Sequence, residues 1–70
     1  MEKLICTPSE AAEMLSIGID HLYRLLESGE IPAFKVGTHW KIPIATLKEY
    51  VIERAIAEAR KRERKDIAYE

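Results

Sequence analysis

The chain opens with a helix signal followed by apolar residues at helical spacing. Thr7-Pro8-Ser9-Glu10 supplies a capping side chain, a proline suited to the first helical position, and an acid that can reach back to the cap. Beyond it, Ala11, Ala12, Met14 and Leu15 form an apolar face. The pattern predicts a short first helix over residues 8–15.

A second apolar face follows after a break at Ser16-Ile17-Gly18. Leu22, Leu25 and Leu26 lie on one side of a helix that we expect over residues 19–28, with Gly18 as its N-cap. Gly29 can take the left-handed conformation that ends many helices. Two short helices joined by a turn containing a glycine predict a helix-turn-helix. The polar face of its second helix carries Asp20, His21, Tyr23, Arg24 and Glu27.

After Pro32, apolar and polar residues alternate, which predicts a β-hairpin. Pairing Val36 with Trp40, and Phe34 with Ile42, would keep the apolar side chains on one face. We therefore expect a three-residue loop, Gly37-Thr38-His39, and not the two-residue Gly37-Thr38 loop that would mix the faces. In the expected register Lys35 and Lys41 lie directly opposite each other on the exposed face.

A third helix is expected to begin at Pro43 and to return Leu47, Tyr50 and Val51 to the core. The fold class is thus mainly α with a small β-hairpin: a winged helix-turn-helix domain over residues 4–51, with an extended C-terminal helix and charged tail over residues 52–70. An apolar stripe continues along that extension as Ile52, Ala55, Ile56 and Ala59. It predicts either a homodimer through the C-terminal helix or docking on the chain's own domain.

Composition narrows the function classes. Seventy residues, 47% of them hydrophobic and 33% charged, fit one globular domain with little interior for an enclosed active site. The chain has no signal peptide pattern or membrane-spanning run, and its single cysteine, Cys6, fits a reducing compartment, so we expect a cytoplasmic protein. No metal-ligand spacing, phosphate loop or catalytic motif occurs, which indicates a protein that is not an enzyme and has no metal or cofactor.

The net charge of −1 counts against nucleic-acid binding, so any basic face must be local. Up to Tyr50, five bases face seven acids. The hairpin offers the densest group of donors, because Lys35 and Lys41 would share its exposed face with Thr38 and His39 at the tip. Such a surface suits phosphates beside a groove, or serves as two solvated lysines that protect a strand edge.

On the second helix, Asp20, His21 and Arg24 lie near the N-terminal end, where a recognition helix meets base edges. Arg24 can pair with guanine, or with Glu27 one turn on. Asp20 can accept a hydrogen bond from cytosine or stabilise the helix dipole. Tyr23 can contact phosphate or cover the edge of the core.

Several segments together closely resemble the excisionase-like, MerR-related family of winged helix-turn-helix DNA-binding proteins. These are residues 7–12, the run Leu22-Tyr23-Arg24-Leu25-Leu26, residues 29–33 and residues 35–43. The resemblance implies sequence-specific binding to double-stranded DNA, with the second helix in the major groove and the wing at the minor groove. It also implies a role as a recombination directionality factor that bends DNA beside an integrase, or as a transcriptional regulator. The family's contact positions fall on Ile19, Asp20, His21, Tyr23, Arg24, Lys35, Thr38, His39 and Lys41.

The chain departs from the family pattern at two places. Ile19-Asp20-His21 follows Gly18 where similar proteins have a serine followed by Arg-Ser-Thr, and His39 stands where arginine is usual. An exposed Ile19 beside Asp20 also suits a protein partner. The alternative function is therefore a protein–protein interaction module on a winged-helix scaffold.

Overall fold

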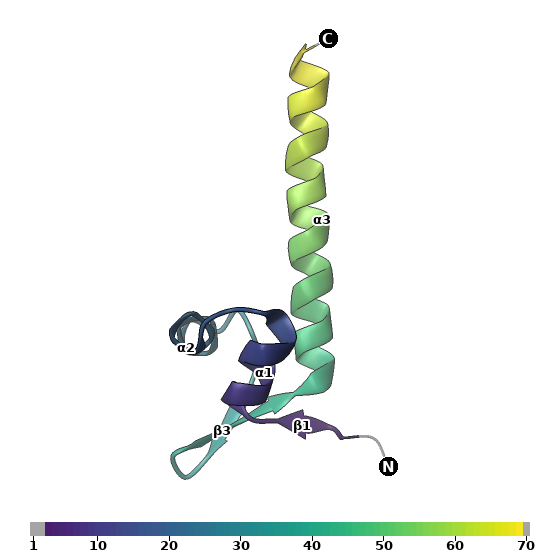
Figure 1. Cartoon of the computed structure of the whole chain (residues 1–70). Coiled ribbons are helices and arrows are strands. Elements are labelled where there is room, and N and C mark those ends of the chain that lie inside the picture. Colours follow the sequence, from purple (N-terminus) through teal and green to yellow (C-terminus); the bar gives the residue numbers. More distant parts are fainter. Residues whose placement is uncertain (1–2, 70) are drawn as a thin grey trace.

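In the computed structural model, which describes the backbone of residues 3–69 and the side chains of residues 3–63, a small head carries one long helix (Figure 1). The longest dimension is 53 Å, against 28 and 18 Å for the other two. The elements in chain order are β1 (Ile5–Cys6), α1 (Pro8–Leu15), α2 (Ile19–Ser28), β2 (Phe34–Val36), β3 (His39–Pro43) and α3 (Ile44–Tyr69). This architecture confirms a mainly helical winged helix-turn-helix. No helix among the described residues is long and apolar enough to cross a membrane.

Both short helices begin and end where the sequence predicts. The Thr7 hydroxyl accepts a hydrogen bond from the Glu10 backbone N–H at 3.2 Å, and the Thr7 backbone N–H donates to the Glu10 carboxylate at 3.0 Å. The two bonds close a capping box at the start of α1. Gly29 ends α2 with φ of 85°. Ser16, the C-cap of α1, also takes a left-handed conformation, with φ of 56°.

The sheet has a third strand, β1, that the sequence pattern does not predict. Its order is β1-β3-β2, and β1 pairs antiparallel with β3 so that Ile5 lies opposite Pro43. The start of α3 was also placed one residue early. Pro43 belongs to β3, and the Ile44 backbone N–H donates to the Leu4 carbonyl at 2.8 Å. Pairing with β1 therefore keeps Pro43 extended, and the helix begins at Ile44.

The expected hairpin register is wrong. Val36 pairs with His39, Lys35 with Trp40 and Phe34 with Lys41, so the loop has only the two residues Gly37-Thr38. Gly37 has φ of 65°. A two-residue loop with glycine in its first position closes an antiparallel hairpin, whereas three-residue loops usually place the glycine last. The position of Gly37 therefore outweighed the tendency of the apolar residues to share one face.

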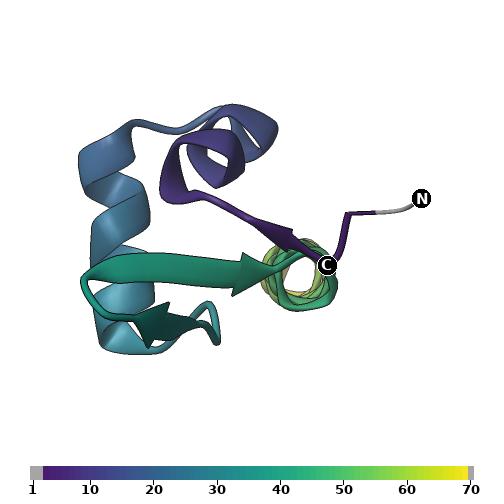
Figure 2. The same ribbon diagram turned by 90° about the horizontal axis from the view of Figure 1, so that it is seen from below.

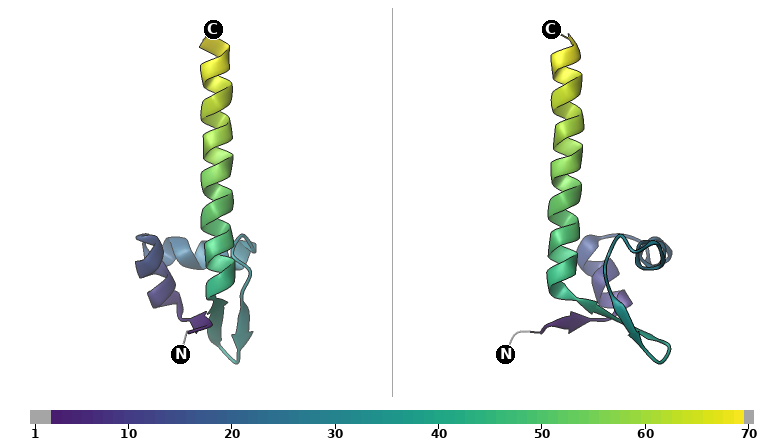
Figure 3. Two further views of the ribbon diagram at one scale, coloured as in Figure 1. Left: turned by 90° about the vertical axis from the view of Figure 1, so that its right-hand side faces the viewer. Right: turned by 180° about the vertical axis from the view of Figure 1, so that it is seen from behind.

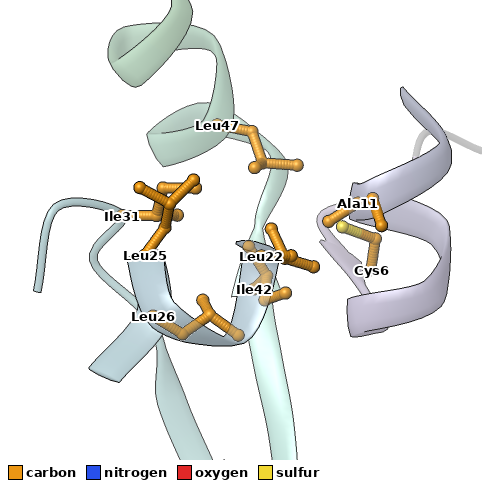
Figure 4. Packing of buried hydrophobic residues seen from close by; sticks show 9 residues of the cluster. Cys6, Ala11, Leu22, Leu25, Leu26, Ile31, Ile42 and Leu47 are labelled. Atoms are coloured by element: carbon orange, nitrogen blue, oxygen red, sulfur yellow. The ribbon is translucent and has the colours of Figure 1, made fainter. Parts of the chain in front are cut away.

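The core lies where α1, α2, β3 and the start of α3 meet (Figure 4). Its buried residues are Cys6, Ala11, Ala12, Leu22, Leu25, Leu26, Ile31, Ile42 and Leu47. Trp40 and Tyr50 are partly buried against it. Val51, expected in the core, is 46% exposed, because the core contacts of α3 end within its first two turns. The helix then continues away from the head (Figure 1).

Candidate DNA-contacting surface

The first part of the surface is the outward face of α2, which lies along one side of the head (Figure 2). Leu22, Leu25 and Leu26 are buried, so the side of the helix opposite to them is exposed. At 3.6 residues per turn, the centre of that side is a line formed by Asp20, Arg24 and Glu27. The structure thus places the predicted Asp20 and Arg24 together, with Glu27 in line.

The other two predicted residues of α2 lie on its flanks. His21 lines a shallow groove with Tyr50, Val51 and Arg54, so its flank faces α3. Tyr23 is 38% exposed and lies on the other flank, because it is two residues further along the helix. His21 and Tyr23 therefore border the central line from opposite sides.

Arg24 is available to an external partner. Within the part of the chain whose side chains are described, no ion pair within 4.0 Å involves it, so the expected alternative pairing with Glu27 is absent. Asp20 and Glu27 nevertheless lie one turn away on either side, which gives the central line two acids and one base. Such a line is repelled by a phosphate backbone, but its donor and acceptors match base edges in a major groove.

The second part of the surface is the β2–β3 hairpin. Opposite residues of an antiparallel pair share a face, and so do alternate residues of one strand. Lys35 and Trp40 therefore lie on the face that also carries the buried Ile42. His39 and Lys41 lie on the other face. The predicted apposition of Lys35 and Lys41 is wrong, as a consequence of the register.

Lys35 has a defined position. Its Nζ lies 4.8 Å from the centre of the Trp40 ring, a cation–π contact that holds the ammonium group beside the hairpin. Thr38 lies in the exposed loop and His39 is exposed next to it, while Lys41 is half-buried. The four predicted hairpin residues thus surround the tip but do not share one face.

The positive charge of the head is concentrated on the hairpin and its flanks. Residues 31–48 contain Lys35, Lys41 and Lys48 and no acid, while the exposed line of α2 carries a net negative charge. A count over the whole head hides this segregation, since acids elsewhere cancel the lysines. The hairpin is therefore the part of the head that attracts an anion.

The remaining titratable groups of interest have structural roles. The Lys3 ammonium group forms an ion pair with the Glu10 carboxylate and donates a hydrogen bond to it. This hydrogen bond, together with the one donated by the Thr7 backbone N–H, lowers the pKa of Glu10. Burial raises the pKa of the Cys6 thiol, which keeps it protonated and unreactive. Among the described residues, no three His, Cys, Asp or Glu side chains are grouped so that they could hold a metal ion.

Comparisons with known proteins give the family. A model described as a helix-turn-helix domain matches residues 5–55, most of the head and the start of the long helix. "Putative antitoxin VapB50" from Mycobacterium tuberculosis (strain ATCC 25618 / H37Rv) is 46% identical over 44 residues, which are 63% of this chain and 34% of the relative. The chain thus aligns with about a third of that relative's length. No solved structure matches this chain. The matched residues include both short helices and the whole hairpin, and the chain belongs to the helix-turn-helix domain family.

Proposed function

We propose that this chain binds double-stranded DNA in a sequence-specific manner, with α2 in the major groove and the β2–β3 hairpin at the adjacent minor groove. One observation carries the proposal. The exposed side of α2 and the acid-free hairpin tip both lie on the side of the head away from α3 (Figures 1 and 3). A single duplex can therefore contact both elements.

The two elements make different contributions. Arg24 donates two hydrogen bonds to a guanine, and Asp20 accepts one from a cytosine amino group. His21 and Tyr23 on the flanks contact the walls of the groove. The hairpin, with Lys35, Lys41, Thr38 and His39, contacts phosphates and supplies most of the electrostatic attraction.

The cellular role follows from where the protein binds. The resemblance to excisionase-like, MerR-related proteins supports a role for this chain as a DNA-bending accessory factor that acts beside an integrase. The relative named an antitoxin supports a regulator of transcription. Either role uses the same head, and the chain acts as a binding protein and not as an enzyme.

Selection of bound duplexes from a random pool tests this proposal. We expect a shared motif containing at least one G·C pair, because Arg24 and Asp20 both recognise such a pair. Arg24→Ala should relax the preference at that position while leaving residual binding by the hairpin. Recovery of unrelated sequences by the unaltered chain would contradict specific binding. Among genomic fragments, sites beside an integrase attachment sequence would indicate recombination, and promoters would indicate regulation.

A second function, protein binding by α3, is favoured by an apolar patch on its lower half. Val51, Ile52 and Ile56 are 46%, 57% and 45% exposed, and Met14 on α1 is 54% exposed beside them. Met14, Leu15, Leu47, Val51 and Ile52 line a groove between the two helices. The patch therefore joins the apolar lining of a groove to exposed apolar side chains of α3, and a two-fold dimer would bury it against the same patch of a second copy.

We therefore propose a second copy of the chain as the partner of this patch. Sedimentation of the whole chain should show a dimer, and Ile52→Glu with Ile56→Glu should reduce its mass to that of a monomer. Glu53→Gln, on another side of the same helix, is the control and should leave the dimer intact. A monomeric unaltered chain at concentrations of tens of micromolar would contradict the proposal.

A further inference from the structure

The hairpin register leaves two large apolar side chains on the outside of the molecule. Phe34 and Val36 are 50% and 57% exposed. They share a face with Lys41 and His39, their cross-strand partners. We call these four residues the outer wing face. Their strand has its apolar side chains outside and its lysine beside Trp40, the reverse of the usual arrangement for a strand on a core.

This arrangement leaves apolar surface to be covered by a partner. Burying a Phe or Val side chain is favourable in proportion to the area removed from water. The two exposed side chains lie on one short strand, in consecutive positions of the same face. They form a small apolar strip that runs back from the hairpin loop.

The charge around the strip indicates the partner. Lys41 and His39 flank the two apolar residues, and no acid occurs between residues 31 and 48. A DNA minor groove combines apolar sugar walls with rows of phosphates, and proteins that bind there often place apolar side chains against it. An exclusively apolar protein pocket would leave the Lys41 ammonium group without an anionic partner.

We propose that the outer wing face packs against the wall of a DNA minor groove. Phe34 and Val36 contact the deoxyribose rings, and Lys41 and His39 contact the flanking phosphates. Val36 borders the loop, and Phe34 lies two residues further, about 7 Å along the strand. A minor groove is about 7.5 Å deep, so Val36 enters it while Phe34 meets its rim. This inference rests on the proposed DNA binding.

The test compares apolar and charged substitutions on this face. Phe34→Thr with Val36→Thr removes the apolar contact and keeps residues that favour strands. We expect its affinity for a selected duplex to fall about 5- to 30-fold, as loss of the burial of two half-exposed side chains implies. The dependence of log affinity on log salt should stay unchanged, because no phosphate contact is lost. Lys41→Gln should instead reduce the magnitude of that negative slope by about 0.9.

A matched control separates this contact from general effects of surface hydrophobicity. Leu4 is 76% exposed and lies near the far end of the sheet, so Leu4→Thr should leave affinity unchanged. Thermal unfolding of each variant shows that the head remains folded. Unaltered affinity of the Phe34→Thr, Val36→Thr variant would overturn the inference and leave the DNA-binding proposal standing. A fall in its salt slope would also overturn it, since the substitutions would then act through phosphates. Failure of the unaltered chain to bind any duplex would instead refute the proposed function itself.

Discussion

Substitution of the two wing lysines separates stability from DNA binding. Lys35 and Lys41 have the same charge and lie on adjacent strands, but only Lys35 has its ammonium group over an aromatic ring, 4.8 Å from the centre of Trp40. Lys35→Gln removes that cation–π contact and one positive charge. Lys41→Gln removes a positive charge alone.

The expected sizes follow from this geometry. A cation–π contact at an exposed site contributes about 0.5–1 kcal/mol. In a domain of 60 to 100 residues, a loss of 1 kcal/mol lowers the unfolding midpoint by about 4–8 °C. Lys35→Gln should therefore lower the midpoint by about 2–8 °C. Each variant should also reduce the magnitude of the salt slope of DNA binding by about 0.9, because in the proposed function each lysine neutralises one phosphate.

Differential scanning calorimetry and a salt series on one duplex measure the two effects separately. Lys35→Arg is the control, because a guanidinium also stacks on Trp40 and should restore both the midpoint and the slope. Equal loss of stability in Lys35→Gln and Lys41→Gln would refute the cation–π contribution. An unchanged slope in both variants would refute phosphate contact by the hairpin.

Four further predictions concern α1, β1 and α2. Thr7→Ala removes the capping hydroxyl and should lower the free energy of unfolding by about 0.5–2 kcal/mol in urea denaturation. Glu10 has a lowered pKa in the folded state, so the stability that it contributes is complete above its unfolded pKa and is lost as the pH falls through its folded pKa. Glu10→Gln should therefore remove that part of the fall in unfolding free energy at acid pH. A pH profile of stability identical to that of the unaltered chain would contradict this prediction. The Cys6 thiol should react slowly with iodoacetamide near pH 8 until denaturant is added, and fast labelling of the folded chain would contradict its burial. Arg24→Ala should weaken binding to the preferred duplex by about 5- to 150-fold, equivalent to one bidentate base contact, and should leave binding to unrelated duplexes nearly unchanged.

Local signals in the sequence predicted both helices of the helix-turn-helix. The capping box at Thr7 and Glu10, and the glycine at position 29, depend on backbone geometry within a few residues. Their boundaries could therefore be predicted without knowledge of the tertiary fold. The two residues of β1 could not, because a strand this short is defined by its pairing with β3.

The hairpin shows where local reasoning failed. Its apolar alternation favoured one register and the position of Gly37 favoured another, and the backbone requirement of the turn prevailed. A one-residue change in loop length moves side chains to the other face. It separated Lys35 from Lys41 and placed Phe34 and Val36 outside.

The exposed residues of α2 were predicted correctly because helical spacing identifies the face opposite three buried leucines. Helical spacing also divides them into a central line and two flanks, but it does not give the direction in which α3 lies. That direction comes from the packing of Tyr50 and Leu47 on the head and has no signal within α2 itself. The segregation of charge, in contrast, could be read from the sequence once the hairpin and α2 were counted separately.

The dependence of DNA affinity on salt tests the central claim most directly. The affinity of the whole chain for a selected duplex should be measured between about 50 and 200 mM salt, beside a scrambled duplex of equal length. Two wing lysines on phosphates predict a slope of log affinity against log salt of about −1.8 or steeper, with tighter binding to the selected duplex throughout. A flat dependence, or equal weak binding to both duplexes, would contradict a hairpin that anchors the head while α2 reads the sequence.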